Sequence, residues 1–365
     1  MVDVYRLAFA SLRGITRRLA QEILGRIGSE QNFFEASEQE LTHRMSCRNS
    51  LFSVDYRREL LEKARRELDF MASNGIKSLY FADDDYPARL AECDDAPLLL
   101  YGLGSADLNS SHVVSIVGTR HATPYGLAFV DGIVKELSAK IPGLVVVSGL
   151  AYGIDVAAHK ASMNYGVPTV GVLAHGLNTI YPASHRQVAA DMVHRGGMLV
   201  TDYMSQTSMH KGNFLARNRI VAGLADCLIV AESAEKGGAL VTANIASEYN
   251  RDVMALPGRS SDKYSRGCNK LIARNVAQLV ECADDVIRCM RWTAVETEGE
   301  QQLLSLDLSP DESKVMGCLG ESGEASLNGL CVKLGIPLNR LMPLLVDMEF
   351  KGLILTYPGG KYRLA

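Results

Sequence analysis

Residues 113–118 read VVSIVG and residues 143–149 read GLVVVSG, with LAFVDGIVKELSAK between them at 127–140. Each β-branched run ends at a glycine, and the segment between them carries apolar residues at helical spacing. A strand, a helix and a second strand in this order predict two parallel strands joined by a crossover helix.

The same alternation continues on the C-terminal side of this unit. Further strand-like runs are PTVGVLA at 168–174, GMLVTDY at 197–203, DCLIVAES at 226–233 and DVMALPG at 252–258, with helical patterns between them. At least six strands of this kind predict an α/β fold, a Rossmann-like doubly wound parallel sheet, which we expect to span residues 81–292.

The flanking regions have other patterns. Residues 1–80 predict a small helical domain, in which the glycine turns Leu12–Ile15 and Arg26–Ser29 are typical of SAM-like and helix-hairpin-helix modules, and equally of ordinary helix ends. The polar, acidic stretch 293–306 predicts a linker, and residues 307–365 predict three helices and a hairpin, which is the pattern of a winged helix.

Charge and composition limit the class of protein. The chain has 365 residues, 47% of them hydrophobic, and a net charge of −4, so a nucleic-acid partner would need a local basic groove. Residues 307–365 hold six Lys or Arg against seven Asp or Glu, which favours a protein contact over duplex DNA for this tail.

Localisation signals and cysteine clusters are not found in the sequence. About 18 uninterrupted apolar residues, the length of a membrane helix, occur nowhere, and no cleavable leader is apparent, so we expect a cytoplasmic protein without a membrane contact. The eight cysteines form no CxxC pair, so we predict reduced thiols and no metal site.

Glycine turns follow several of the predicted strands. They are SIVGTR at 115–120, SGLAYGID at 148–155 and EKGGALVTA at 235–243, and strand ends of this kind let backbone amides approach an anion. No GxxxxGK[ST] motif and no GxGxxG fingerprint with a distant acidic residue occur, so we predict neither ATP nor NAD, and no cofactor.

The segment KGNFLARNR at 211–219 places an aromatic ring among cations. Phe214 can stack on a base of any kind while Lys211 and Arg217 contact phosphates on either side, which is the composition of a site that follows a single strand. A core phenylalanine beside a solvated helix face is the equally simple alternative.

Together these segments resemble one known family. In this order and spacing they match the pattern VGTR, SGxAxGID, FxxRNRxxxGL, KxGxLxTA, PG and GxNxLI of the DNA-processing protein A (DprA/Smf) family over roughly residues 112–290, with Tyr181-Pro182 and His185 also in place. The chain departs from the pattern at Leu215, at Gly237 and at residues 274–276.

The resemblance implies a dimeric protein that binds single-stranded DNA without strict sequence preference, protects it and helps RecA to load during natural transformation and recombination. It implies nucleic-acid contacts from two sets of residues, those in the glycine turns and those on or after the 211–219 segment. The predicted site residues are Gly118, Arg120, Ser148, Gly149, Lys211, Asn213, Phe214, Arg217, Arg219, Lys236, Gly237 and Asn269.

Two other functions remain open. A nucleotide-processing hydrolase of the lysine-decarboxylase-like group would need a PGGxGTxxE motif, but here Glu248 falls too late after Gly238. A pure adaptor would use the fold only to dimerise and recruit partners. His159 and His175 have no evident nucleophile partner, so we predict that the protein is not an enzyme.

Overall fold

The computed structural model describes residues 3–295, 309–351, 353–357 and 360–364. Contacts between residues divide the chain into two compact units, Met1–Glu296 and Thr297–Ala365, which are described separately. Most of the predicted linker, 293–306, lies outside the described residues.

The first unit is built on a nine-stranded sheet with the order β1-β2-β6-β5-β4-β3-β7-β8-β9. Its strands are β1 (Lys77–Tyr80), β2 (Leu99–Gly104), β3 (His112–Val117), β4 (Leu144–Ser148), β5 (Thr169–Val172), β6 (Met198–Thr201), β7 (Cys227–Val230), β8 (Asp252–Ala255) and β9 (Gln278–Leu279). The six predicted strands are β3 to β8, and these are parallel to one another.

The sheet is not wholly parallel, which corrects the sequence-based expectation. Strand β2 pairs antiparallel with β6, and β1 pairs antiparallel with β2. Because β1 starts at Lys77, the sheet begins before the expected boundary at residue 81. The predicted crossover pattern contained no signal for these two strands, since a crossover helix is needed only between parallel neighbours.

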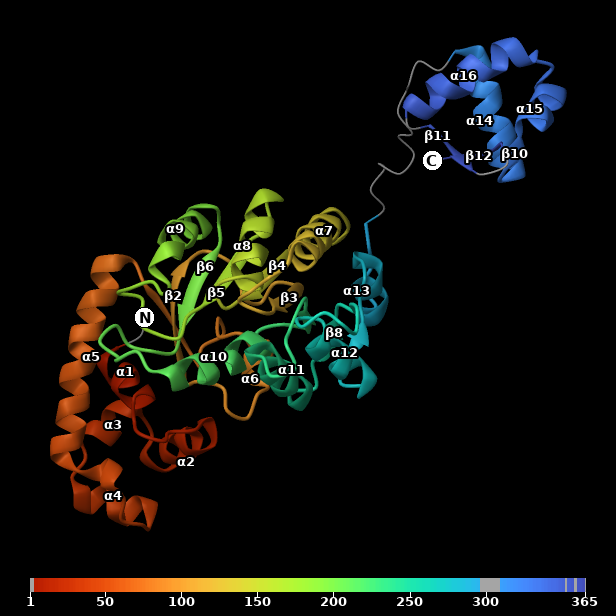
Figure 1. Ribbon diagram of the computed structural model, residues 1–365. Helices are drawn as coiled ribbons and strands as arrows, with labels where there is room; N and C mark the ends of the chain where they lie inside the picture. The colour runs from red at the N-terminus through yellow and green to blue at the C-terminus, as the bar shows by residue number, and fades with distance from the viewer. Residues whose placement is uncertain (1–2, 296–308, 352, 358–359, 365) are drawn as a thin grey trace. The chain divides into compact units, whose positions relative to one another are not determined.

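Helices cover both faces of the sheet, as Figure 1 shows. One face packs against α7 (Pro124–Lys140), α8 (Ile154–Asn164) and α13 (Ala283–Met290), and α9 (Arg186–His194) lies beside α8. The other face packs against α10 (Lys211–Gly223), α11 (Gly238–Glu248) and α12 (Arg266–Ala273). Strand β3 alternates between the two cores, with Val113 and Val117 in one and Val114 and Ile116 in the other.

Strand β3 stands where the winding reverses. From β3 the chain proceeds to β4, β5 and β6 on one side, and later to β7, β8 and β9 on the other. In an open parallel sheet the crevice at such a switch point, beyond the carboxyl ends of the strands, is where ligands bind. The fold therefore directs attention to the loops that follow β3, β4 and β7.

The N-terminal region is helical, and its assignment as a separate SAM-like or helix-hairpin-helix domain stays a prediction. It contains α1 (Val4–Ala10), α2 (Arg17–Ile27), α3 (Glu30–Glu35), α4 (Glu38–Met45), the short 3-10 helix Ser50–Phe52 and α5 (Val54–Asn74). Arg57 is buried and donates to the carbonyls of Phe33, Phe34 and Ala36 over 2.6–3.0 Å, so one side chain of α5 ties down the α3 region. A contact between the turn at Gly14 and DNA stays a prediction.

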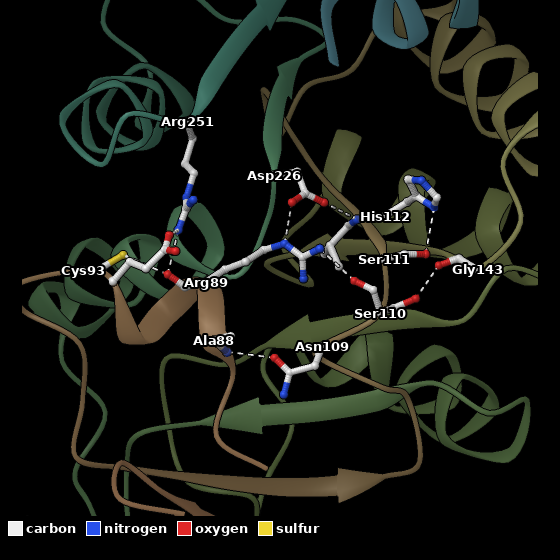
Figure 2. A network of polar contacts seen from close by, with 12 residues as sticks. Ala88, Arg89, Cys93, Asn109, Ser110, Ser111, His112, Gly143, Asp226 and Arg251 are labelled. Atoms are coloured by element: carbon white, nitrogen blue, oxygen red, sulfur yellow. Dashed lines mark hydrogen bonds and ion pairs between the residues drawn. The ribbon is translucent and has the colours of Figure 1, made fainter. Parts of the chain in front are cut away.

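The amino ends of the strands carry an extensive polar network, drawn in Figure 2. Arg89, on the short helix α6 (Ala88–Ala91), donates from Nε to Asp226 Oδ1 over 2.5 Å and from a terminal nitrogen to the Ser110 carbonyl over 2.7 Å. Asp226 also accepts the backbone N–H of Val113, and Arg251 donates to the Arg89 carbonyl and to Glu92. This network fastens α6 to the starts of β3, β7 and β8.

The second unit consists of α14 (Pro310–Ser322), α15 (Leu327–Leu334), α16 (Leu338–Phe350) and an antiparallel sheet of β10 (Ala325–Ser326), β12 (Lys361–Leu364) and β11 (Ile354–Tyr357). Three helices and a paired β11 and β12 agree with the sequence, and β10 is an additional strand. Assignment to the winged-helix class stays a prediction.

Among the described helices no single one is long and apolar enough to cross a membrane. A bent pair, Leu327–Leu334 with Leu338–Phe350, meets the length and composition requirement only when the two helices are joined across a bend of 115°.

Candidate nucleic-acid interface

A cavity of about 500 Å³ lies at the switch point, beyond the carboxyl ends of β3, β4 and β7. Its walls come from the turn at 118–121, the turn at 149–155, the α10 face around Phe214, the loop at 233–239 and the side chains of Lys263 and Tyr264. Segments far apart in sequence therefore meet here, and the volume suits a ligand of nucleotide size.

The turns after β3 and β4 are fitted closely together. The backbone N–H of Ile154 donates to the Thr119 carbonyl over 3.2 Å, and a Cβ at position 153 would lie 2.2 Å from that same oxygen. Gly153 also has a φ of +76°, so the close approach requires glycine here. Buried Leu150 has a left-handed φ of 57°, a backbone conformation that is often found at binding sites.

Asp155 connects the turns that follow β3 and β4. It is buried at the start of α8, and its carboxylate accepts the backbone N–H of Ala151 over 3.4 Å, with the backbone N–H groups of Gly118 and Gly149 also near enough to lower its pKa. Burial raises the pKa of Asp155, whereas the nearby Arg217 and the three backbone donors act in the opposite direction. The carboxylate thus fixes the positions of the turn backbones that line the cavity.

Arg217 also stabilises the ends of the strands, at β4 and β5. Its side chain is only 5% exposed, and it donates from Nη1 to the carbonyls of Gly149 and Val172, each over 2.5 Å. A Cβ at position 149 would lie 2.1 Å from this nitrogen, so glycine is needed there for the guanidinium to reach the backbone. Burial lowers the pKa of Arg217, and Arg120 lowers it further, while Asp155 opposes them.

Arg217 therefore holds strand ends together, which differs from the phosphate contact expected from the sequence. Nε of Arg217 is buried without a hydrogen-bond partner in the described part of the chain. A direct contact between this guanidinium and DNA stays a prediction, but its bonds to β4 and β5 make it a positioning residue.

Three other cations at the cavity are exposed, in contrast to the buried Arg217. Arg120, Lys236 and Lys263 line it and are solvent-exposed. Within residues 3–295 none of the three takes part in a hydrogen bond or an ion pair, whereas the neighbouring Glu235 pairs with Lys270 at 3.1 Å. The buried Asp155 is the one carboxylate among the cavity-lining residues, so the rim is positively charged.

Phe214 faces the cavity from the first turns of α10. Phe214, Arg217, Asn218 and Val221 line it with the spacing of one helix face. Lys211 is exposed and does not line the cavity, but it lies one turn before Phe214 on the same side of the helix. Helix geometry therefore places Lys211 and Phe214 on one side of α10, and their joint role in DNA binding stays a prediction.

Tyr181 extends this aromatic surface. Its ring centre lies 5.6 Å from that of Phe214 at an interplanar angle of 66°, and the residue is 48% exposed. The backbone N–H of Tyr181 donates to Nε2 of buried His175, whose Nδ1 donates to the Gly176 carbonyl. Burial lowers the pKa of His175, so the neutral form required by these two bonds is favoured.

Seven of the twelve predicted site residues line the cavity. These are Gly118, Arg120, Gly149, Phe214, Arg217, Lys236 and Gly237.

The other predicted residues have different surroundings. Buried Ser148 donates to the Ile116 carbonyl, and Asn269 bonds both the N–H and the carbonyl of Gly258, so these two shape the scaffold. Asn213 bonds the Ser208 carbonyl, and Arg219 forms an ion pair with Asp202 at 2.6 Å on another side of α10. A DNA contact from any of them stays a prediction.

Sequence reasoning did not select His121, Lys263 and Tyr264, which also line the cavity. His121 directly follows Arg120, a predicted site residue, so its position in the same turn could have identified it. The loop carrying Lys263 and Tyr264 connects β8 to α12, and no periodic pattern could have brought it to the switch point.

The histidines near the sheet are structural. His159 is fully buried, its Nδ1 donates to Thr169 Oγ1 over 2.7 Å, and burial lowers its pKa to about 3. Within the described residues no group of three or more His, Cys, Asp or Glu side chains is arranged to hold a metal ion.

Comparison with known proteins gives a consistent assignment. Residues 77–291 match the family model of DNA recombination-mediator protein A. The chain is 39% identical to the DNA processing protein DprA of Streptococcus pneumoniae over 210 residues, which cover 58% of this chain and 73% of that protein. It is 30% identical to the protein Smf of Synechocystis over 316 residues, covering 77% of this chain and 78% of that one.

Solved structures agree. The chain is similar to the X-ray structure of DprA from Streptococcus pneumoniae, with a TM-score of 0.65, 31% identity and coverage of 79% of this chain and 98% of that one. It is similar to DprA from Helicobacter pylori, a structure described for its unique single-stranded DNA binding mode, with a TM-score of 0.52, 28% identity and coverage of 59% and 95%. The chain therefore belongs to the DNA recombination-mediator protein A family, whose relatives found here are named DprA or Smf.

Proposed function

We propose that this protein binds single-stranded DNA without strict sequence preference in the cavity at the sheet's switch point. The observation that carries the proposal is the combination of unpaired rim cations with an accessible aromatic surface. Arg120 and Lys236 are available for phosphates, and the Phe214 ring in the cavity wall, with the half-exposed Tyr181 ring beside it, offers an aromatic surface for an unpaired base. Duplex DNA fits poorly, because its bases are already stacked on one another.

The cavity supports binding more than catalysis. Asp155, the one carboxylate among the described lining residues, is buried and accepts the backbone N–H of Ala151, and both His159 and His175 are buried. Glu248, which a hydrolase of the lysine-decarboxylase-like group would need close to Gly238, ends α11 about 15 Å along the helix from that glycine. We therefore propose that the protein is not an enzyme.

The biological role follows from the family. We propose that the protein protects incoming single strands in the cytoplasm and promotes the loading of RecA onto them in natural transformation and recombination. A homodimer would hold two cavities on one particle and so raise the effective concentration of each for a shared strand. Leu271 is buried in the core, so the neighbouring Ile272 is the better candidate for a dimer contact on α12.

The second unit supports a protein partner over duplex DNA. We propose a winged helix here whose third helix, α16, exposes Leu338, Met342, Val346 and Phe350 at intervals of four residues. A helix that reads a major groove would present polar and basic side chains on such a face.

The proposal is tested by fluorescence polarisation of a labelled oligonucleotide, single-stranded against duplex. We expect wild-type protein to prefer the single strand. Phe214→Ala should weaken that binding about 5- to 150-fold relative to wild type through lost stacking. Lys211→Glu should also weaken it, and its loss of affinity relative to wild type should grow as the salt concentration is lowered. The matched control is Lys135→Glu, which makes the same charge change at an exposed site two-thirds of the way along α7.

Equal affinity for duplex and single strand would refute the single-strand assignment. Unchanged binding by both Phe214→Ala and Lys211→Glu would remove the cavity from the mechanism and favour the adaptor function. RecA loading is measured separately, as the rate of filament growth on strands already covered by a single-strand-binding protein; no acceleration by the wild-type chain would refute that role.

A further inference from the structure

The cavity has a second aromatic surface that belongs to none of the family motifs found in the sequence. It consists of His121, from the turn after β3, with Lys263 and Tyr264, from the loop between β8 and α12, and all three line the cavity. We call these three residues the Tyr264 platform. Phe214 and Tyr181 form the Phe214 platform.

The rings of His121 and Tyr264 lie roughly parallel to one another. The centres of His121 and Tyr264 lie 6.1 Å apart with an interplanar angle of only 27°. Nζ of Lys263 lies 5.3 Å from the centre of the Tyr264 ring, within the range of a cation–π contact. An aromatic face beside a cation is the same chemistry that Phe214 and Lys211 present on α10.

The loop that carries Tyr264 is held in place by its backbone. The Tyr264 carbonyl accepts the N–H of Ser233 over 2.7 Å, so the loop is joined to the segment that leads to Lys236. At the other end, Tyr125 Oη donates to the Pro257 carbonyl over 2.8 Å, and Asn269 bonds Gly258. A platform fixed in this way does not have to be ordered when a ligand binds, which favours affinity.

Two exposed cations line the same cavity as Phe214, His121 and Tyr264. Arg120 directly precedes His121 and Lys236 lies in the loop that bonds Tyr264, and both are exposed on the cavity. Two aromatic surfaces from different elements, joined by cations, suit a flexible chain with alternating bases and phosphates.

We propose that the Tyr264 platform is a second stacking site for the same strand, so that bases bind at both platforms while Arg120 and Lys236 hold the intervening backbone. This proposal rests on the single-strand binding proposed above. It predicts that the Tyr264 platform contributes only when the strand is long enough to extend beyond the Phe214 platform.

The experiment uses the full chain and a series of oligothymidylates of increasing length. For Tyr264→Leu we expect about a tenfold or greater loss of affinity for long strands and unchanged affinity for the shortest strands that bind. Phe214→Leu should weaken binding at every length. The matched control is Tyr165→Leu, since Tyr165 lies at the C-terminal end of α8, away from the cavity.

A second measurement separates stacking from a role in loop structure. Tryptophan fluorescence is quenched when a base stacks on the ring, and the chain has a single natural tryptophan, Trp292, as background. Tyr264→Trp should lose emission when a long strand is added, and Tyr165→Trp should not. If Tyr264→Leu were to unfold, this variant would decide the question.

The outcomes are distinguishable. Undiminished affinity of Tyr264→Leu at every length, or unquenched emission of a Tyr264→Trp variant that still binds the strand, would overturn the second platform and leave the proposed function intact. Failure of the wild-type chain to bind any single strand would overturn both.

Discussion

The two ends of the sheet use charged side chains in opposite ways. At the amino ends, Arg89 is engaged by Asp226 and the Ser110 carbonyl, as Figure 2 shows. Arg251 is engaged by Glu92 and the Arg89 carbonyl. At the carboxyl ends, Arg120, Lys236 and Lys263 line a cavity, and none of them has an acidic partner within the described part of the chain. The cations with partners fasten helices to strands, and those without partners remain available to a ligand.

Arg217 shows that position in a motif does not decide between these uses. It lies in the same segment as Phe214 and lines the same cavity, yet its guanidinium is buried against the carbonyls of Gly149 and Val172. The useful distinction is therefore between cations satisfied by the protein and cations left unsatisfied.

The largest effect is expected at a buried charged donor. Arg217→Ala should lower the free energy of unfolding by about 3–5 kcal/mol, since the buried carbonyls of Gly149 and Val172 would each lose a hydrogen bond from a charged group and the ends of β4 and β5 would lose their link. Urea denaturation followed by circular dichroism measures it. A variant as stable as the wild type would mean that Arg217 is not structural.

A smaller loss of stability is expected from a substitution at the amino ends of the strands. Asp226→Ala removes the partner of Arg89 and an acceptor for the Val113 N–H, and should cost about 2–3 kcal/mol because the pair is partly exposed. The folded fraction should still bind single-stranded DNA with wild-type affinity. Loss of binding without loss of stability would contradict the division of roles between the two ends.

Acidification should destabilise the fold through His159. Because its pKa is lowered to about 3 in the folded protein, the unfolded chain takes up a proton first as the pH falls below the ordinary value of 6.5. Its contribution to stability is complete above pH 6.5 and declines by at most about 1.4 kcal/mol per pH unit toward pH 3. His159→Leu should show a shallower decline over this window; an identical pH profile would contradict this assignment.

The smallest effect on stability is expected at the rim. Arg120→Gln and Lys236→Gln should each change the free energy of unfolding by no more than about 0.5 kcal/mol, because neither side chain has a hydrogen-bond or ion-pair partner among residues 3–295. Thermal denaturation checks this. A substantial loss would place these residues with the structural cations.

The sequence predicted the central fold because six β-branched runs and their crossover helices are local patterns. It did not predict β1 and β2, because the antiparallel pairing of β1 with β2, and of β2 with the distant β6, leaves no crossover pattern in the sequence. The glycine turns identified the edge of the sheet that holds the cavity, since the ends of parallel strands meet there.

The use of individual side chains was less predictable. Burial of Arg217 depends on the space left by Gly149, and the position of Tyr264 in the cavity wall depends on a backbone hydrogen bond with Ser233. Neither relation has a spacing along the chain that a pattern could detect. Arg219 illustrates the same limit, because its partner Asp202 follows a different strand.

The most direct test of the account is the salt dependence of single-strand affinity. A plot of log affinity against log salt concentration should be steep for wild type and less steep by about 0.7 for each phosphate contact removed in Arg120→Gln and in Lys236→Gln, with no change in Lys135→Gln. Wild-type slopes in both rim variants, or an equal change in the Lys135 control, would contradict the claim that the unpartnered cations at the carboxyl ends hold the strand.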